Sequence, residues 1–342
     1  MSTANEELWN EEKSSRRKLI RRASTFLVFL AIIVGLFCVW LTQPIFFNSS
    51  KSVSVVVVDA ERLKAHVSKL SDEFYPRNHL NLQNLNATAD YVRSEFEKTG
   101  GKVSEQRFTV NGAEYRNVRL ELGEDEADGR IVVGAHYDSA FDTHGADDNA
   151  SGVAGLIELA NLIAKQNLSR KVEFVVFSLE EPPFFGTEEM GSFVHAQWLR
   201  EKGVKVKLTI CLEMIGYYTD EPHSQNFPLF LGRLLYPSTG NFAAVVGDFT
   251  NVNSVRQVKG AMATVDGVDT YSLNAPSFFG GVNLSDHRNY WQKGYDAVMI
   301  TDTAFFRNKA YHTVGDTSDR LDYSKMAKVV DGVGRAIVKL AK

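Results

Sequence analysis

Residues 131–160, IVVGAHYDSAFDTHGADDNASGVAGLIELA, constrain the fold more than any other part of the chain. They begin with an apolar run typical of a buried strand and end with apolar residues spaced three and four apart, which predicts a helix. His136 and Asp138 follow the strand run and, being two residues apart, share one face of a strand. Asp148 comes just before the helix, where the positive end of the helix dipole favours a carboxylate.

Three further runs resemble buried strands: residues 172–179, 206–216 and 296–302. They are mostly apolar throughout, as expected for strands that helices cover on both faces. Residues 118–122 alternate between apolar and charged side chains, which predicts a half-buried strand. The sequence therefore predicts an α/β fold: a single-domain three-layer sandwich whose central, mostly parallel mixed sheet carries helices on both faces. Ligands of such folds bind beyond the carboxyl ends of the strands.

The N-terminal 50 residues have a different character. Residues 23–50 carry no charged side chain, and the apolar part is about the roughly 20 residues that cross a bilayer as a helix. The basic residues immediately before it place the N-terminus in the cytoplasm by the positive-inside rule: Arg16, Arg17, Lys18, Arg21 and Arg22. A cleaved signal peptide is the alternative, but the apolar core exceeds the roughly 7 to 15 residues usual for one.

These features predict a cytoplasmic basic tail over residues 1–22, a transmembrane anchor over 23–47, a linker over 48–58 and one globular domain over 59–342. The protein is then a single-pass membrane protein with this domain on the extracytoplasmic side, whether periplasmic, extracellular or lumenal. The net charge is only -4, and no basic run follows residue 22, so nothing indicates a nucleic-acid partner.

Acidic and imidazole side chains recur after the predicted strands. The first strand run is followed by His136 and Asp138, the second by Glu180 and Glu181, and Glu213 lies within the third. Tyr311, His312 and Thr313 follow the last run. Because the ends of parallel strands meet at one edge of a sheet, these groups predict a site for a divalent cation, and mixed nitrogen and oxygen ligands suit zinc.

Six short motifs together resemble the M28 family of zinc metallopeptidases, most of all its membrane-anchored or secreted aminopeptidases. In chain order they are GAHYDS, GADDNASG, the glutamate pair, LEMIG, SDH at residues 285–287 and YHT at 311–313. The resemblance covers residue 58 to the C-terminus. It implies two zinc ions bridged by Asp148, with His136 and Glu213 on one ion and Glu181 and His312 on the other.

The resemblance also implies the reaction, which is hydrolysis of the N-terminal residue of a peptide substrate by a water that the two zinc ions activate. Glu180 corresponds to the general base, and Asp138 to the carboxylate that orients His136. Tyr311 matches a tyrosine that hydrogen-bonds the oxyanion in one branch of the family. The family also has a cis peptide bond after the bridging aspartate, here between Asp148 and Asn149.

Two positions depart from the family pattern. Aminopeptidases of the family usually have aspartate where this chain has Glu213. A second acidic pair, Glu188 and Glu189, follows the first, but we assign the metal site to Glu180 and Glu181 because they come directly after a buried strand.

Two other functions are compatible with the sequence. One is a glutaminyl-cyclase-like transferase on the same fold, which would use one zinc ion. The other is a catalytically inactive ectodomain that serves as a binding module. The full set of candidate ligands for two ions favours the aminopeptidase.

Overall fold

The computed structural model describes residues 3–43, 58–124, 128–228 and 230–342. The chain divides into two compact units, Met1–Pro44 and Ile45–Lys342. Except for Val58, the predicted linker lies outside the described residues, and so does the end of the predicted anchor at residues 44–47.

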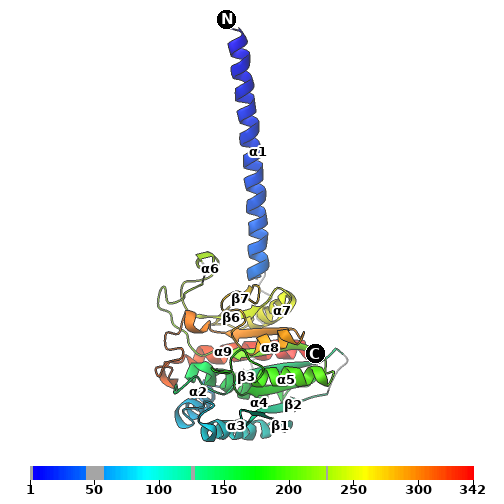
Figure 1. Cartoon of the computed structure of the whole chain (residues 1–342), viewed down its shortest axis with the longest axis vertical. Coiled ribbons are helices and arrows are strands. Elements are labelled where there is room, and N and C mark those ends of the chain that lie inside the picture. The colour runs from blue at the N-terminus through cyan, green and yellow to red at the C-terminus, as the bar shows by residue number, and fades with distance from the viewer. Residues whose placement is uncertain (1–2, 44–57, 125–127, 229) are drawn as a thin grey trace. The chain divides into compact units, whose positions relative to one another are not determined.

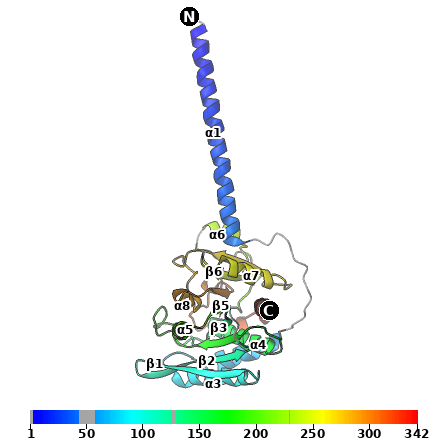
Figure 2. The same ribbon diagram turned by 90° about the vertical axis from the view of Figure 1, so that its right-hand side faces the viewer.

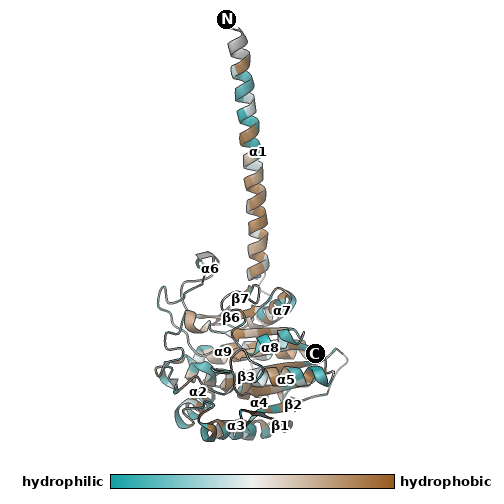
Figure 3. Ribbon diagram, viewed as in Figure 1, coloured by the Kyte–Doolittle hydropathy of each residue, from teal (hydrophilic) through white to brown (hydrophobic). Residues whose placement is uncertain are grey.

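The first unit is a single helix, α1, spanning Thr3–Thr42. Within the described ranges, its segment Leu8–Thr42 is the one helix that is long and apolar enough to cross a membrane, with a mean hydropathy of 2.6 in its most apolar window. Figure 3 shows the second half of α1 in brown and several hydrophilic turns of its first half in teal. By length and composition, α1 fits a membrane anchor or a signal sequence.

The second unit is built on an eight-stranded sheet with the order β1-β2-β4-β3-β5-β8-β6-β7 (Figures 1 and 2). The four strands at its centre, β4, β3, β5 and β8, run parallel, whereas β2 and β6 pair antiparallel with β4 and β8. This arrangement confirms the predicted mixed sheet. The strands are β1 (Lys102–Val110), β2 (Ala113–Leu122), β3 (Arg130–His136), β4 (Val172–Phe177), β5 (Val206–Glu213), β6 (Phe242–Gly247), β7 (Asp269–Asn274) and β8 (Ala297–Thr301).

Helices cover both faces of the sheet, which confirms the three-layer sandwich. One face packs against α2 (Ala60–Ser68), α3 (Leu82–Glu97), α4 (Gly152–Ile163), α7 (Val252–Met262) and α9 (Tyr323–Leu340). The other face packs against α5 (Gly191–Glu201) and α8 (His287–Gln292). The short helix α6 (Phe230–Leu235) lies in the connection from β5 to β6, and the remaining turns are η1 (Lys69–Glu73), η2 (Ala146–Ser151), η3 (Ala304–Phe306) and η4 (Ser318–Arg320).

Alternating side chains of the central strands supply both layers of the core. In β3, Ile131 and Val133 pack with the first set of helices, and Val132 packs with the second. Because both faces are covered, the strand is apolar at every one of these positions rather than at every second one. Burying one such side chain contributes about 1.5–3 kcal/mol, so the central strands hold the two layers firmly in place.

The strand over residues 118–122 is more deeply buried than its alternating sequence predicts. Arg119 of β2 is only 8% exposed. Its guanidinium donates to Glu173 of the neighbouring strand β4 at 2.6 Å, and Arg130 donates to the same carboxylate at 2.8 Å. The charged face of the strand is therefore an internal ion-pair layer and not a solvated surface.

Candidate metal centre

The carboxyl edge of the parallel strands gathers the side chains singled out in the sequence. His136 is the last residue of β3 and Glu213 the last of β5. Glu181 lies in the loop after β4, and His312 lies in the loop after β8. Asp148 lies in η2, between β3 and α4. Five separate segments therefore bring an acid or an imidazole to one place.

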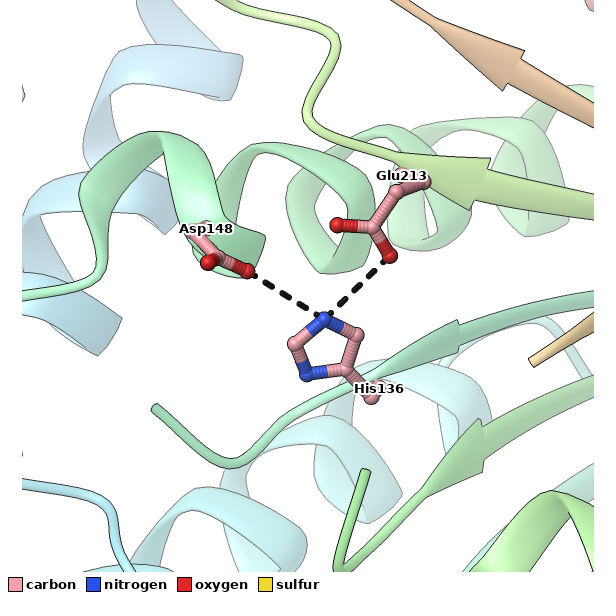
Figure 4. A group of neighbouring side chains, drawn as sticks. All are labelled: His136, Asp148 and Glu213. Carbon is pink, nitrogen blue, oxygen red and sulfur yellow. Dashed lines mark ion pairs between the residues drawn. The ribbon is translucent and has the colours of Figure 1, made fainter. Parts of the chain in front are cut away.

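The first group of these side chains consists of His136, Asp148 and Glu213, all three buried. The Nε2 atom of His136 lies 3.3 Å from Oδ1 of Asp148 and 3.4 Å from Oε2 of Glu213 (Figure 4). In Figure 4 both carboxylates point at the same ring nitrogen, so the three ligand atoms face one small volume.

The second group consists of Asp148, Glu181 and His312. The Nε2 atom of His312 lies 3.1 Å from Oδ2 of Asp148 and 3.2 Å from Oε2 of Glu181. In each group the ligand atoms lie within 4.8 Å of one another. Asp148 belongs to both groups and turns one carboxylate oxygen toward each histidine.

The hydrogen bonding of these side chains fits bound metal ions. Among the described residues, Nε2 of His136, Nε2 of His312 and Oε1 of Glu181 are buried without a hydrogen-bond partner. Each buried polar atom left unpaired costs about 1–3 kcal/mol, a cost that a coordinated cation removes. Imidazole nitrogens combined with carboxylate oxygens are a donor set that suits zinc.

Asn149 fixes the distance between Asp148 and Glu213. Its side chain donates to the carbonyl of Leu212 at 2.8 Å and accepts from the backbone N–H of Met214 at 3.1 Å. It thus holds both neighbours of Glu213. The peptide bond between Asp148 and Asn149 is cis, as the family resemblance implied.

The loop before Asp148 depends on Gly145. This residue has a left-handed φ of +55°, and a Cβ atom there would lie 2.3 Å from the carbonyl oxygen of Asp148. Glycine is therefore required at this position, because any side chain would clash with the Asp148 carbonyl.

Asp138 supports two parts of the site at once. Its carboxylate accepts hydrogen bonds from the backbone N–H groups of Glu180 at 3.1 Å and Glu181 at 3.0 Å. The Nδ1 atom of His136 lies 3.2 Å from the Asp138 carbonyl and 3.5 Å from its carboxylate. These acceptors assign the proton of His136 to Nδ1 and leave Nε2 free as a ligand.

Glu180 lies beside the first group, with Oε2 at 3.9 Å from Nε2 of His136. Burial raises its pKa well above the ordinary value, and the charges of Glu213 and Glu181 raise it further against the opposing effect of His136. Burial lowers the pKa of His136, but the charges of Glu180 and Glu213 outweigh this effect and raise it. The site therefore concentrates negative charge, which bound cations would neutralise.

Tyr311 stacks on the ring of His312, with the ring centroids 3.7 Å apart. Burial and the nearby acidic groups raise the pKa of its hydroxyl, so the hydroxyl remains a hydrogen-bond donor at neutral pH.

The other acidic residues near the site are not candidate ligands. Glu188 and Glu189 are exposed and belong to neither ligand group. The carboxylate of Asp147, the other aspartate of the loop, accepts hydrogen bonds from the Gly216 N–H at 3.0 Å and from the Asn308 side-chain amide at 2.9 Å.

The sequence does not mark Arg77, which is 1% exposed and contacts the loops of the candidate metal centre. Its guanidinium donates to four carbonyls, those of Leu70 and Gly145 at 2.8 Å, Tyr137 at 3.1 Å and His144 at 2.7 Å. Burial lowers its pKa to about 10, against the raising effect of Asp316 and Asp138, so it stays charged at neutral pH. No motif in its neighbourhood, YPRNH, marks it in the sequence.

A largely apolar pocket opens beside Glu213 and Tyr311. Its walls come from the β5–β6 connection, from β6, β7 and β8, and from the loops around residues 280–284 and 303–306; they include Phe227, Tyr236, Phe242, Val246, Tyr271, Leu284, Met299, Phe305 and Phe306. Arg307 lies buried behind this wall, where it donates to Gln225 at 2.9 Å and to the carbonyl of Phe242 at 2.9 Å. Phe305 and Phe306 thus line the pocket, and Arg307 next to them supports its wall.

Comparison with known proteins gives a consistent result. The sequence profile described as "Peptidase family M28" matches residues 117–337. The Escherichia coli (strain K12) protein named "Uncharacterized protein YfbL" is 49% identical over 282 residues, which are 80% of this chain and 86% of that protein.

Two solved structures share the fold at low sequence identity. BSAP, a zinc aminopeptidase from Bacillus subtilis, matches with a TM-score of 0.66 at 15% identity, over 83% of this chain and 95% of that chain. A Bacteroides thetaiotaomicron glutaminyl cyclase bound to N-acetylhistamine matches with a TM-score of 0.63 at 20% identity, over 83% of this chain and 99% of that chain.

Proposed function

The chain belongs to peptidase family M28, and on that premise we propose that it is a zinc-dependent aminopeptidase that removes N-terminal residues from peptides. The observation that carries the proposal is the position of Asp148, whose two oxygens face His136 at 3.3 Å and His312 at 3.1 Å. A carboxylate shared by two ligand groups is the arrangement that a two-metal hydrolase needs.

In this proposal two zinc ions are held by the two groups. His136, Asp148 and Glu213 hold one ion, and Asp148, Glu181 and His312 hold the other. Bound zinc polarises a substrate carbonyl and lowers the pKa of water toward ~7. The unpaired buried nitrogens of both histidines support this assignment.

The protein's own groups then handle the proton and the developing charge. Glu180 takes the proton of the attacking water and returns it to the amine that leaves. The Tyr311 hydroxyl donates a hydrogen bond to the carbonyl oxygen as negative charge develops there. Asp138 keeps His136 and the glutamate pair in position through its hydrogen bonds.

The neighbouring pocket supports a preference for a large apolar N-terminal residue. Its walls are aromatic and aliphatic, and Glu213 and Tyr311 form its boundary with the metal centre. A side chain in the pocket places the first peptide bond at the metal centre.

The Glu180→Gln variant tests this function in the full-length, detergent-solubilised protein. We expect its zinc content to match that of the wild type while turnover of leucine amide falls by about 10²- to 10⁴-fold, the usual contribution of a general base. Glu189→Gln removes a similar charge from an exposed position and serves as the matched control. Full activity of Glu180→Gln would reject the assignment.

The same preparations test the second candidate function. The likeness to a glutaminyl cyclase extends over 99% of that chain, so cyclisation is a chemistry that this fold accommodates. Peptides beginning with glutamine distinguish the two reactions: an aminopeptidase releases free glutamine, whereas a cyclase releases ammonia and leaves a blocked peptide. A protein that binds zinc and catalyses neither reaction is a binding module.

We further propose that α1 anchors the protein in a membrane. The basic residues of the tail, 1–22, precede the apolar segment, 23–47, so the tail is cytoplasmic and the catalytic domain, 59–342, extracytoplasmic after a linker over 48–58. Protease added to sealed vesicles that expose the extracytoplasmic face should then digest the domain and spare the tail. N-terminal sequencing of the mature protein distinguishes an anchor, which retains residue 1, from a cleaved signal peptide.

A further inference from the structure

Phe141 occupies an unfavourable position beside the metal centre. It lies in the loop between β3 and η2, its side chain is 60% exposed, and its ring lies edge-on to the ring of His312 with centroids 6.2 Å apart. Its backbone has a left-handed φ of +47°. A bulky residue rarely adopts this conformation, which costs about 1–3 kcal/mol outside glycine.

The rest of the molecule holds Phe141 in place and gains no core packing from its ring. The amide of Asn78 donates to the Phe141 carbonyl, and the hydroxyl of Tyr75 donates to the next carbonyl, that of Asp142, at 2.8 Å. The Thr143 N–H closes the turn onto Ala140 at 3.1 Å. Folding alone would favour glycine or asparagine here, and strained positions of this kind cluster at functional sites.

Phe141 is next to the metal centre but is not part of the apolar pocket. The pocket is bounded by Glu213, from the first ligand group, and by Tyr311. Phe141 is not part of its lining and contacts His312, from the second group. A peptide whose first side chain fills the pocket has its second side chain outside the pocket, and the exposed ring of Phe141 next to His312 is available to contact it.

We infer that Phe141 is a specificity-determining residue that binds the side chain after the scissile bond and favours an apolar or aromatic one there. This inference rests on the proposed aminopeptidase function. The left-handed backbone presents the ring to the substrate, and the hydrogen bonds from Asn78 and Tyr75 fix its direction, so little conformational freedom is lost on binding.

The experiment compares three substrates with the same first residue: Leu-Phe-NH₂, Leu-Gly-NH₂ and leucine amide. In Phe141→Ala, kcat/KM for Leu-Phe-NH₂ should fall by about tenfold, as expected for loss of one aromatic contact. The values for Leu-Gly-NH₂ and leucine amide, which place no side chain on Phe141, should stay within about twofold. Phe249→Ala is the matched control, because Phe249 is another partly exposed aromatic residue and follows β6, which runs antiparallel to β8 and so ends at the opposite edge of the sheet.

A second variant separates specificity from folding. Phe141→Asn removes the ring but tolerates the left-handed backbone, so its thermal unfolding midpoint should equal or exceed that of the wild type while it shows the same selective loss. A fall in unfolding midpoint would show that the ring serves stability, which overturns the inference.

The remaining outcomes are also decisive. Equal losses on all three substrates would show that Phe141 acts by positioning His312, and an unchanged profile would show that it does not contact substrate; either result overturns the inference while the wild-type activity still supports the proposed function. If the wild type hydrolyses none of the three substrates, the proposed function fails and the inference fails with it.

Discussion

Asp138 and Glu181 are joined by a hydrogen bond of 3.0 Å from the backbone N–H of Glu181 to the carboxylate of Asp138. The other oxygen of Asp138 accepts from Glu180 in the same way at 3.1 Å. One carboxylate thus positions the candidate base and a candidate ligand, and it also lies next to Nδ1 of His136.

Replacing this carboxylate by an amide should impair the site without removing any proposed metal ligand. In Asp138→Asn, the new NH₂ group faces an N–H donor, so the glutamate pair loses one of its two supports. We expect activity or zinc affinity to fall by about 10- to 100-fold, the usual effect of losing a residue that orients metal ligands. Zinc titration and leucine amide turnover measure the two effects, and unchanged values in both would refute the positioning role.

Asp148 should be required for both metal ions. We expect about two zinc ions per chain in the wild type, about one in His312→Gln and fewer than one in Asp148→Asn, because an amide is a poor zinc ligand and Asp148 belongs to both groups. Elemental analysis after gel filtration gives the stoichiometry, and Glu188→Gln, at an exposed position, is the control. Equal zinc contents in Asp148→Asn and wild type would contradict a shared ligand.

Removal of metal should make stability depend on pH. In the metal-free protein, burial, together with the charge of Asp148, raises the pKa of Glu181 from 4.5 to about 8. For His312, burial acts in the opposite direction, but Asp148 and Glu181 outweigh it and raise the pKa from 6.5 to about 10. Both groups bind protons more tightly when folded, so their stabilising contributions are complete below the unfolded values and are lost as the pH rises through the folded ones.

The thermal unfolding midpoint of chelator-treated protein should therefore be lower at pH 8.5 than at pH 6, because folded Glu181 loses its proton over this pH range. Zinc should restore stability most at the higher pH, because it replaces the lost protons. Calorimetry at both pH values measures the difference, and Glu181→Gln, which cannot titrate, should show a shallower dependence. A midpoint of the metal-free protein that rises with pH would refute this account.

The pocket wall offers a position at which its size can be changed without disturbing the backbone. Gly280 lines the pocket, and a Cβ atom there would meet nothing within 4 Å. Gly280→Leu should lower kcat/KM for leucine amide by about tenfold or more, because the pocket has less room for an apolar side chain, and should affect alanine amide much less. Gly260→Leu, in equally open space on α7, is the control. Equal losses on both substrates would show that the pocket does not hold the first residue.

The sequence predicts those elements best whose pattern is local. The run over residues 172–179 is strand β4 over Val172–Phe177, and the run over residues 206–216 contains strand β5, Val206–Glu213. No such pattern marks the edge strand β7, Asp269–Asn274. Its sequence, DTYSLN, is polar because an edge strand is buried less fully, and the apolar signal of the central strands is absent.

The grouping of the site residues also follows from the sequence, since parallel strands bring their carboxyl ends to one edge. The contacts that hold these residues in place do not follow from the sequence. Asn149 acts through residues on either side of Glu213, and Arg119 is buried only because Glu173 on the next strand receives it. Such contacts join residues far apart in the chain, and no local pattern encodes them. The metal-binding and catalytic roles of the site residues stay predictions: these are His136, Asp148, Glu181, Glu213 and His312 for metal binding, and Glu180, Asp138 and Tyr311 for catalysis.

Arg77 links the first helices of the domain to the loops of the candidate metal centre, because it joins the carbonyl of Leu70 to those of Tyr137, His144 and Gly145. It precedes residue 117, where the match to the family profile begins. We therefore expect the smallest fragment that folds on its own to be longer than the region that matches the family profile. A chain trimmed to that region would keep every proposed ligand and lose the internal cation that ties their loop to the N-terminal helices.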